Sequence, residues 1–117
     1  MKKNTGLRRI LLAAGYSWQG LVATFRHEAA FRQELGLLVV LSPVALWLGD
    51  NALESALMIA TLLIVLIVEI VNSAVESIID LVSPEHHELA GRAKDQGSAA
   101  VLLALILAGI VWIAVII

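Results

Sequence analysis

The sequence predicts an all-α membrane protein: three transmembrane helices preceded by an amphipathic helix at the membrane interface. Hydrophobic residues make up 60% of the 117-residue chain and charged residues only 15%, and the mean hydropathy is +0.91. A water-soluble fold of this length exposes too much surface to hide so many apolar side chains. The net charge of −2 provides no basic surface for nucleic acid, which is not expected as a partner.

Charge-free stretches locate the spans within a single membrane domain, residues 1–117. The spans are expected at about 29–48, 52–81 and 96–117. The last is the clearest, because residues 97–117 carry no charge and a spanning helix needs about 20 residues. The first is the weakest, because its charge-free core is short and contains Pro43. Neighbouring helices tolerate such a kink in a membrane.

The stretch before the first span predicts a helix over about residues 5–26. Apolar residues, among them Trp18 and Phe25, recur at spacings of three and four, while Arg8 and Arg9 fall largely elsewhere. A basic amphipathic helix with aromatic residues on its apolar side lies in the membrane interface. A simple positively charged anchor accounts for the same residues equally well.

The distribution of Lys and Arg predicts the orientation. Six of the eight precede the charge-free core of the first span, and Arg92 and Lys94 lie between the second and third spans. Positively charged loops remain in the cytoplasm. The N-terminus and the 81–96 loop are therefore expected on the cytoplasmic side, and the 49–54 loop and the C-terminus on the periplasmic side.

The second span carries a stripe of polar side chains. Asn72, Glu76 and Asp80 follow Glu69 at offsets of three, seven and eleven. At 3.6 residues per turn, all four fall within an arc of about 80°. A carboxylate at membrane depth costs about 2.5–3.5 kcal/mol and persists where it faces a partner, a cavity or a metal. Asp80 is equally well explained as a solvated residue at the rim of the bilayer.

The carboxylates predict a hard-cation site. Oxygen ligands with few fixed protein contacts suit Mg²⁺, which is usually shared with a phosphate. Lys94 and Arg92 in the following loop can hold an anion, although a solvated cytoplasmic loop explains them too. The adjacent His86 and His87 do not indicate zinc, because the chain has no Cys and no HExxH spacing.

Small residues on the last span predict self-association. Ala100, Ala104 and Ala108 form a ladder that permits close helix packing. One chain of three spans offers little room to enclose Glu69 and Glu76, which favours a homo-oligomer with sites at subunit boundaries. An ordinary lipid-facing, alanine-rich helix is the alternative.

Four segments resemble the bacterial integral-membrane diacylglycerol kinases, and the resemblance covers nearly the whole chain. They are residues 13–18 (AAGYSW), 28–34 (EAAFRQE), 68–76 (VEIVNSAVE) and 87–95 (HELAGRAKD). The resemblance implies an enzyme of the bacterial inner membrane that transfers the γ-phosphate of MgATP to diacylglycerol. It further implies a homotrimer whose active sites are shared between subunits.

The resemblance also implies residue roles. Glu69 matches the catalytic base with Asn72 beside it, and Glu28 and Glu76 match ligands of Mg²⁺, the implied cofactor. The positions that match the ATP site are Arg9, Tyr16, Glu28, Glu76, Glu85, His86, His87, Lys94 and Asp95. The positions that match the lipid-substrate site are Phe31, Arg32, Glu34, Trp47, Glu69, Ser98 and Trp112.

Three other functions remain compatible with parts of this pattern. Undecaprenol is the acceptor in kinases of the same fold, and no residue here decides between it and diacylglycerol. A small proton-coupled exporter also uses a membrane-embedded Glu, but it is expected to have about four spans. A non-enzymatic membrane subunit would not need Glu28, Glu69 and Glu76 together.

Overall fold

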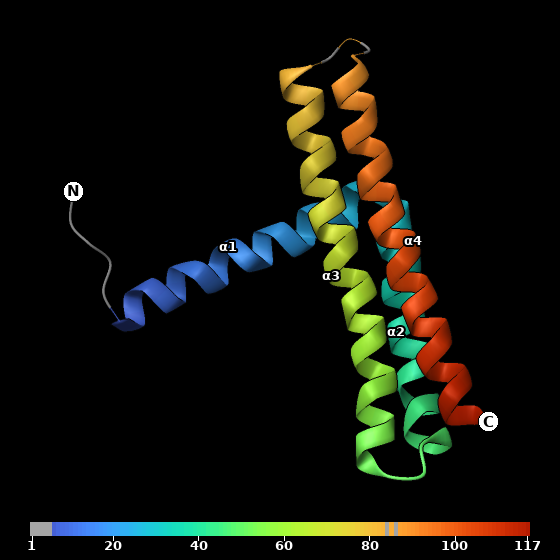
Figure 1. Cartoon of the computed structure of the whole chain (residues 1–117). Coiled ribbons are helices and arrows are strands. Elements are labelled where there is room, and N and C mark those ends of the chain that lie inside the picture. Colours follow the sequence, from blue (N-terminus) through green and yellow to red (C-terminus); the bar gives the residue numbers. More distant parts are fainter. Residues whose placement is uncertain (1–5, 84, 86) are drawn as a thin grey trace.

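The computed structural model describes residues 6–83, 85 and 87–117, which form four helices and no strand. The helices are α1 (Gly6–His27), α2 (Ala29–Leu48), α3 (Ala52–Val82) and α4 (Glu88–Ile116). Figure 1 shows α2, α3 and α4 side by side, while α1 projects away from them at a steep angle. The predicted all-α class is confirmed, and so are three helices long and apolar enough to cross a membrane, α2, α3 and α4.

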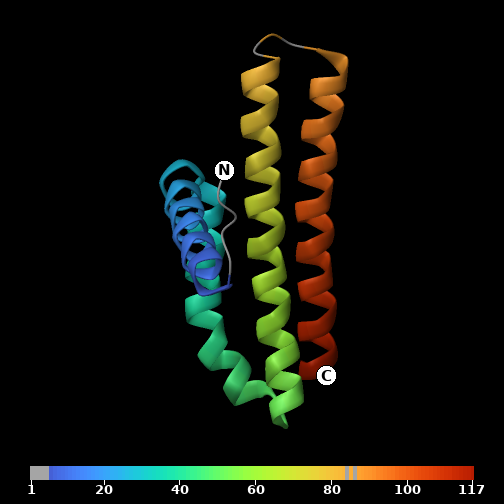
Figure 2. The same ribbon diagram turned by 90° about the vertical axis from the view of Figure 1, so that its left-hand side faces the viewer.

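The three apolar helices differ in length. The 20 residues of α2 extend over about 30 Å, which matches the hydrocarbon core of a bilayer. The 31 residues of α3 and the 29 of α4 are longer, and Figure 2 shows both helices extending well past the start of α2. The last helix begins at Glu88, eight residues before the span expected from residue 96. His87 caps it by accepting a hydrogen bond at Nδ1 from Leu89 N, at 3.1 Å.

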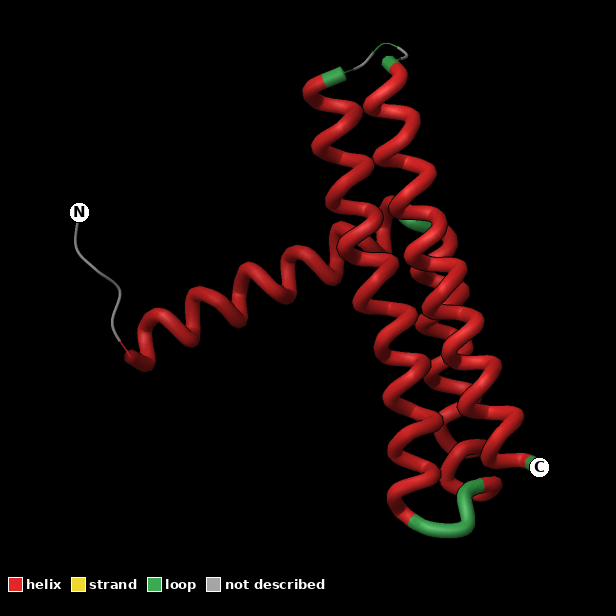
Figure 3. The backbone as a smooth tube through the Cα atoms, in the orientation of Figure 1, coloured by secondary structure: helices red, strands yellow, loops and turns green. Residues whose placement is uncertain are grey.

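The chain turns sharply at both ends of α2 (Figure 3). Glu28 alone separates α1 from α2, with an extended backbone at φ −118° and ψ 107°. Arg32 holds this corner, because its Nη1 donates to the carbonyl oxygens of Phe25 at 2.7 Å and Arg26 at 3.2 Å. These carbonyls end α1 and have no partner within the helix. Helix α1 itself runs without interruption through Gly15 and Gly20.

Helix α3 lies between α2 and α4 and contributes most of the buried residues. Met58, Val65 and Leu66 of α3 are buried, as are Ala45 of α2 and Ala104 of α4. Two side-chain hydrogen bonds tie the helices together: Ser55 Oγ donates to Ala45 O at 2.8 Å, and Trp112 Nε1 donates to Met58 O at 3.1 Å. In the apolar interior of a membrane, such bonds satisfy polar groups that cannot form hydrogen bonds with water.

Most of the large apolar side chains on α2, α3 and α4 point outward, as Val39, Ile67 and Leu103 do. A water-soluble monomer rarely exposes so much contiguous apolar surface. The bundle is therefore built to be covered by lipid or by other copies of the chain. In the ladder of small residues, Ala104 is buried within the protomer and Ala100 is exposed.

Candidate active site

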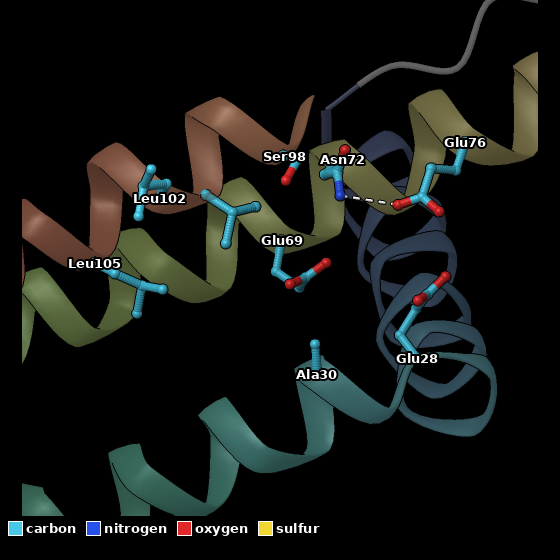
Figure 4. Close-up of a pocket in the computed structure, with 9 residues that line it drawn as sticks. Glu28, Ala30, Glu69, Asn72, Glu76, Ser98, Leu102 and Leu105 are labelled. Carbon is cyan, nitrogen blue, oxygen red and sulfur yellow. Dashed lines mark hydrogen bonds between the residues drawn. The ribbon is translucent and has the colours of Figure 1, made fainter. Parts of the chain in front are cut away.

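A cavity of about 350 Å³ opens between α2, α3 and α4, next to the corner at Glu28. Figure 4 shows Glu28, Glu76 and the amide of Asn72 toward one end of this cavity, leucines at the other, and Glu69 between them. The polar residues that line it are Glu28, Glu69, Asn72, Glu76 and Ser98, and the apolar ones are Ala30, Val101, Leu102 and Leu105. The structure therefore brings together polar residues that are up to 70 positions apart in the chain, as Glu28 and Ser98 are.

Glu69 is the most deeply buried carboxylate of the cavity, with 4% of its surface exposed. Its side chain points from α3 into the space opposite Ala30 of α2 (Figure 4). Glu34, one turn further along α2, lies beside the Glu69 carboxylate. Among the described residues, no hydrogen bond reaches the buried Oε1 of Glu34. A half-buried carboxyl group, Glu34, thus lies beside the buried one, Glu69.

Glu28 and Glu76 lie at the open end of the cavity, and a neighbour from α3 orients each of them. Ser73 Oγ donates to Glu28 Oε1 at 3.0 Å, which joins the corner between α1 and α2 to α3. Asn72 Nδ2 donates to Glu76 Oε1 at 2.9 Å (Figure 4). Both bonds use Oε1, and no bond to Oε2 of either carboxylate is found among the described residues. Each side chain is therefore held in place with one oxygen available to a ligand.

This donor set fits Mg²⁺ shared with a nucleotide. Among the described residues, no three Asp, Glu or His side chains are placed to hold a metal ion by themselves. Mg²⁺ does not need such a cage, because it is usually bound by one or two carboxylates together with substrate phosphates and water. Glu28 and Glu76 supply two carboxylates at one end of the cavity, and a cation there would relieve the repulsion between them.

The other residues expected around the nucleotide lie along the α3–α4 hairpin beyond the cavity. Lys94 forms an ion pair with Asp80, with 3.1 Å between Nζ and Oδ1, and both side chains are well exposed. Asp95 and Glu85 are exposed, and His87 caps α4. His86 lies outside the described residues. Lys94 thus stands about one helical turn from Ser98 and the cavity.

Arg9 and Tyr16 are not brought to this cavity within one protomer. Both are exposed on α1, which points away from the bundle (Figure 1). At 1.5 Å per residue, Arg9 lies about 27 Å and Tyr16 about 17 Å from the end of α1 that meets Glu28.

The residues expected at the lipid site are spread along the bundle. Phe31 is buried beside an apolar cavity of about 520 Å³ between α1 and the α2–α3 face. Arg32 caps α1, as described above. Trp47 is 81% exposed near the far end of α2. Trp112 bonds to Met58 O, which lies about 17 Å along α3 from Glu69.

Sequence reasoning did not single out Ser73, which the structure places against Glu28. The available signal was its offset of four from Glu69, which puts its hydroxyl on the same helical face as the carboxylates. Sequence reasoning also did not decide whether Asp80 belongs to the site or is only solvated at the rim of the bilayer. In the structure Asp80 is exposed and forms an ion pair with Lys94. That partner comes from a different helix.

Comparisons with known proteins show the family to which the chain belongs. A family model described as Prokaryotic diacylglycerol kinase matches residues 15–116. The Diacylglycerol kinase of Escherichia coli (strain K12) is 55% identical over 109 residues, which cover 92% of this chain and 88% of that protein. The Diacylglycerol kinase of Pseudomonas aeruginosa is 54% identical over 111 residues, 95% of this chain and 90% of that protein.

A third relative extends over almost the full length of both chains. The Diacylglycerol kinase of Haemophilus influenzae is 48% identical over 112 residues, 96% of this chain and 95% of that protein. Together with the three apolar helices, these relatives make the chain a multi-pass bacterial membrane protein and an ATP-dependent kinase. It belongs to the prokaryotic diacylglycerol kinase family.

Proposed function

We propose that this chain transfers the γ-phosphate of MgATP to the hydroxyl of diacylglycerol, which yields phosphatidic acid and ADP. One observation carries the proposal beyond family membership: a single cavity holds a buried carboxylate, Glu69, and two hydrogen-bonded carboxylates, Glu28 and Glu76. A kinase needs a proton acceptor for the attacking hydroxyl and a place for the metal that accompanies the phosphates.

In this mechanism Glu28 and Glu76 would hold Mg²⁺ at the open end of the cavity. When bound there, the metal would neutralise charge on the phosphates. Lys94 lies about one helical turn from Ser98 at the cavity. It leaves its ion pair with Asp80 and pairs with the phosphates instead. Glu69 accepts the proton of the lipid hydroxyl while the hydroxyl oxygen forms a bond to the γ-phosphorus. The bond between the γ-phosphorus and the leaving ADP breaks. Asn72 keeps Glu76 oriented throughout.

The depth of Glu69 selects a lipid acceptor. Its carboxylate lies in the middle of the cavity, between Leu102 and Leu105 at one end and Glu28 and Glu76 at the other (Figure 4). Glu69 is buried within an apolar helix, and only a hydroxyl that resides in the membrane reaches that depth. The apolar cavity beside Phe31 suits an acyl chain. Glu34 and Ser98 flank the headgroup, while Arg32, Trp47 and Trp112 line the rest of the lipid's path.

The position of Arg9 and Tyr16 supports a homotrimer with shared sites. Both residues match the nucleotide site of the family, yet both lie too far along α1 to reach the cavity of their own protomer. In a closed ring, α1 of one subunit extends toward the cavity of its neighbour. The exposed apolar faces of the bundle and Ala100 provide the surfaces for such an assembly.

Mixed oligomers test this arrangement. Arg9→Ala and Glu69→Gln protomers, each inactive alone, are expected to regain about a quarter of the sites when mixed randomly in equal amounts, if each site takes Arg9 from the neighbour. Glu28→Gln mixed with Glu69→Gln is the control and should recover nothing, because both carboxylates line one cavity. Absence of recovery in the Arg9 mixture, with subunit exchange verified, would contradict sharing.

We propose the orientation from the charge distribution: N-terminus and α3–α4 connection in the cytoplasm, Asn51 and the C-terminus in the periplasm of the inner membrane. The chain has no Cys, so single substitutions report it directly. In whole cells, a membrane-impermeant thiol reagent is expected to label Asn51→Cys but not Glu88→Cys until the membrane is opened. The reverse labelling would invert the topology.

The acceptor is tested by supplying diacylglycerol and undecaprenol side by side in mixed micelles with radiolabelled ATP. We expect phosphatidic acid as the main product. Preference for undecaprenol would retain the kinase and change the substrate. Transfer to neither lipid would overturn the proposed function and leave a small exporter or a non-enzymatic membrane subunit as the alternatives. An exporter is expected to have about four spans, and the described residues contain three candidate spans.

A further inference from the structure

Gly97 of α4 lies against the side chain of Asn72 of α3. A Cβ at position 97 would overlap Asn72 Oδ1 and lie 3.0 Å from Asn72 Cγ and 3.8 Å from Asn72 Cβ. The Asn72 amide therefore occupies the space that a side chain at position 97 would need. The backbone of Gly97 has an ordinary helical conformation, so this glycine is required for its missing side chain and not for an unusual φ.

This contact fixes one end of the Asn72 amide. Oδ1 is buried and has no hydrogen-bond donor among the described residues, and it faces the backbone of Gly97. A glycine Cα–H is a weak donor that suits a carbonyl oxygen and not an NH₂ group. The other end of the amide, Nδ2, donates to Glu76 Oε1 at 2.9 Å. Gly97 and Glu76 thus distinguish the two ends of the amide.

We propose that Gly97 is a positioning residue of the active site: it admits the Asn72 amide with its oxygen toward α4 and its NH₂ toward Glu76. Any side chain at position 97 pushes the amide out of this place. Glu76 then loses the bond that orients its carboxylate toward the cavity. The consequence for Mg²⁺ rests on the proposed function, whereas the contact between Gly97 and Asn72 does not.

Gly97→Ala tests the proposal, with Gly109→Ala as the matched control. Both changes place the same methyl group on α4 and gain the same helix propensity, but a Cβ at position 109 meets nothing within 4 Å. Loss of a bond that orients a metal ligand typically costs about 10–100-fold in metal affinity or activity. We expect the Mg²⁺ concentration for half-maximal activity to rise by about that factor in Gly97→Ala and to stay unchanged in Gly109→Ala.

A double-mutant cycle isolates the route through Asn72. Asn72→Ala removes the amide and leaves room for the methyl group, so Gly97→Ala should have no further effect in that background on Mg²⁺ dependence or turnover. Independent losses that add would overturn the proposal, as would a wild-type Mg²⁺ dependence in Gly97→Ala. If Gly97→Ala alone fails to fold, the double variant should fold as well as Asn72→Ala does, and failure of both variants would contradict the contact.

Thermal unfolding in detergent separates this inference from the proposed function. If the wild-type protein phosphorylates no lipid, the function fails. The same cycle still tests the contact, because Gly97→Ala should then lower the unfolding temperature with Asn72 present and not with Ala at position 72. Equal shifts in the two backgrounds would reject the contact itself.

Discussion

Glu69→Gln is expected to lower turnover by roughly 10²–10⁴-fold, the usual contribution of a general base. Glutamine keeps the size and the hydrogen-bonding capacity of the side chain but cannot take up a proton at neutral pH. Glu69 is buried in the middle of the cavity, deeper than Glu28 and Glu76, which lie at its open end (Figure 4). Binding of MgATP should therefore survive the substitution.

The decisive measurement pairs turnover with nucleotide affinity on the same purified variant. Glu54→Gln is a suitable control, because Glu54 lies in the first turn of α3, where its Oε1 accepts from Asp50 N at 2.9 Å. A glutamine can keep that bond, and the site is about 22 Å along the helix from Glu69. Near-normal turnover of Glu69→Gln, or a loss of nucleotide binding in step with turnover, would exclude Glu69 as the base.

Glu76→Gln is expected to raise the Mg²⁺ concentration for half-maximal activity by at least about 100-fold, more than the effect of altering a residue that only supports a metal ligand. The amide oxygen of glutamine can still accept from Asn72 Nδ2, so the local geometry is retained while the negative charge is lost. Glu28→Gln should act in the same direction, because its carboxylate faces the same end of the cavity.

This result is read from activity against Mg²⁺ concentration at saturating ATP, together with the oligomeric state of each variant. Asp80→Asn is the comparison, since Asp80 lies one turn further along the same face and pairs with Lys94. It removes a charge without removing a cavity residue and should leave the Mg²⁺ dependence unchanged. An unchanged Mg²⁺ dependence in both Glu28→Gln and Glu76→Gln would show that these carboxylates do not bind the metal.

The local sequence pattern predicts that these helices form, but it predicts where they begin and end less well. Charge-free stretches locate the later part of α2, residues 35–48, and nearly half of α3, residues 55–68, because a residue that faces lipid must be apolar whatever its neighbours are. The same reasoning does not find the first turns of α4, which precede the expected span. Its first turns are polar, and they are helical because His87 caps them and because α3 extends alongside them outside the apolar region.

Spacing within one helix also determined part of the site. Glu69, Asn72 and Glu76 lie on one face of α3 because a helix repeats every 3.6 residues, and the cost of carboxylates at membrane depth marked that face as functional. Tertiary structure alone decided what meets it. Glu28 reaches the cavity because the chain turns at that residue and Ser73 bonds to it, and Gly97 admits Asn72 because α4 passes close by at that point. Contacts between residues so far apart in the chain depend on how whole helices pack, and no local periodicity encodes that packing.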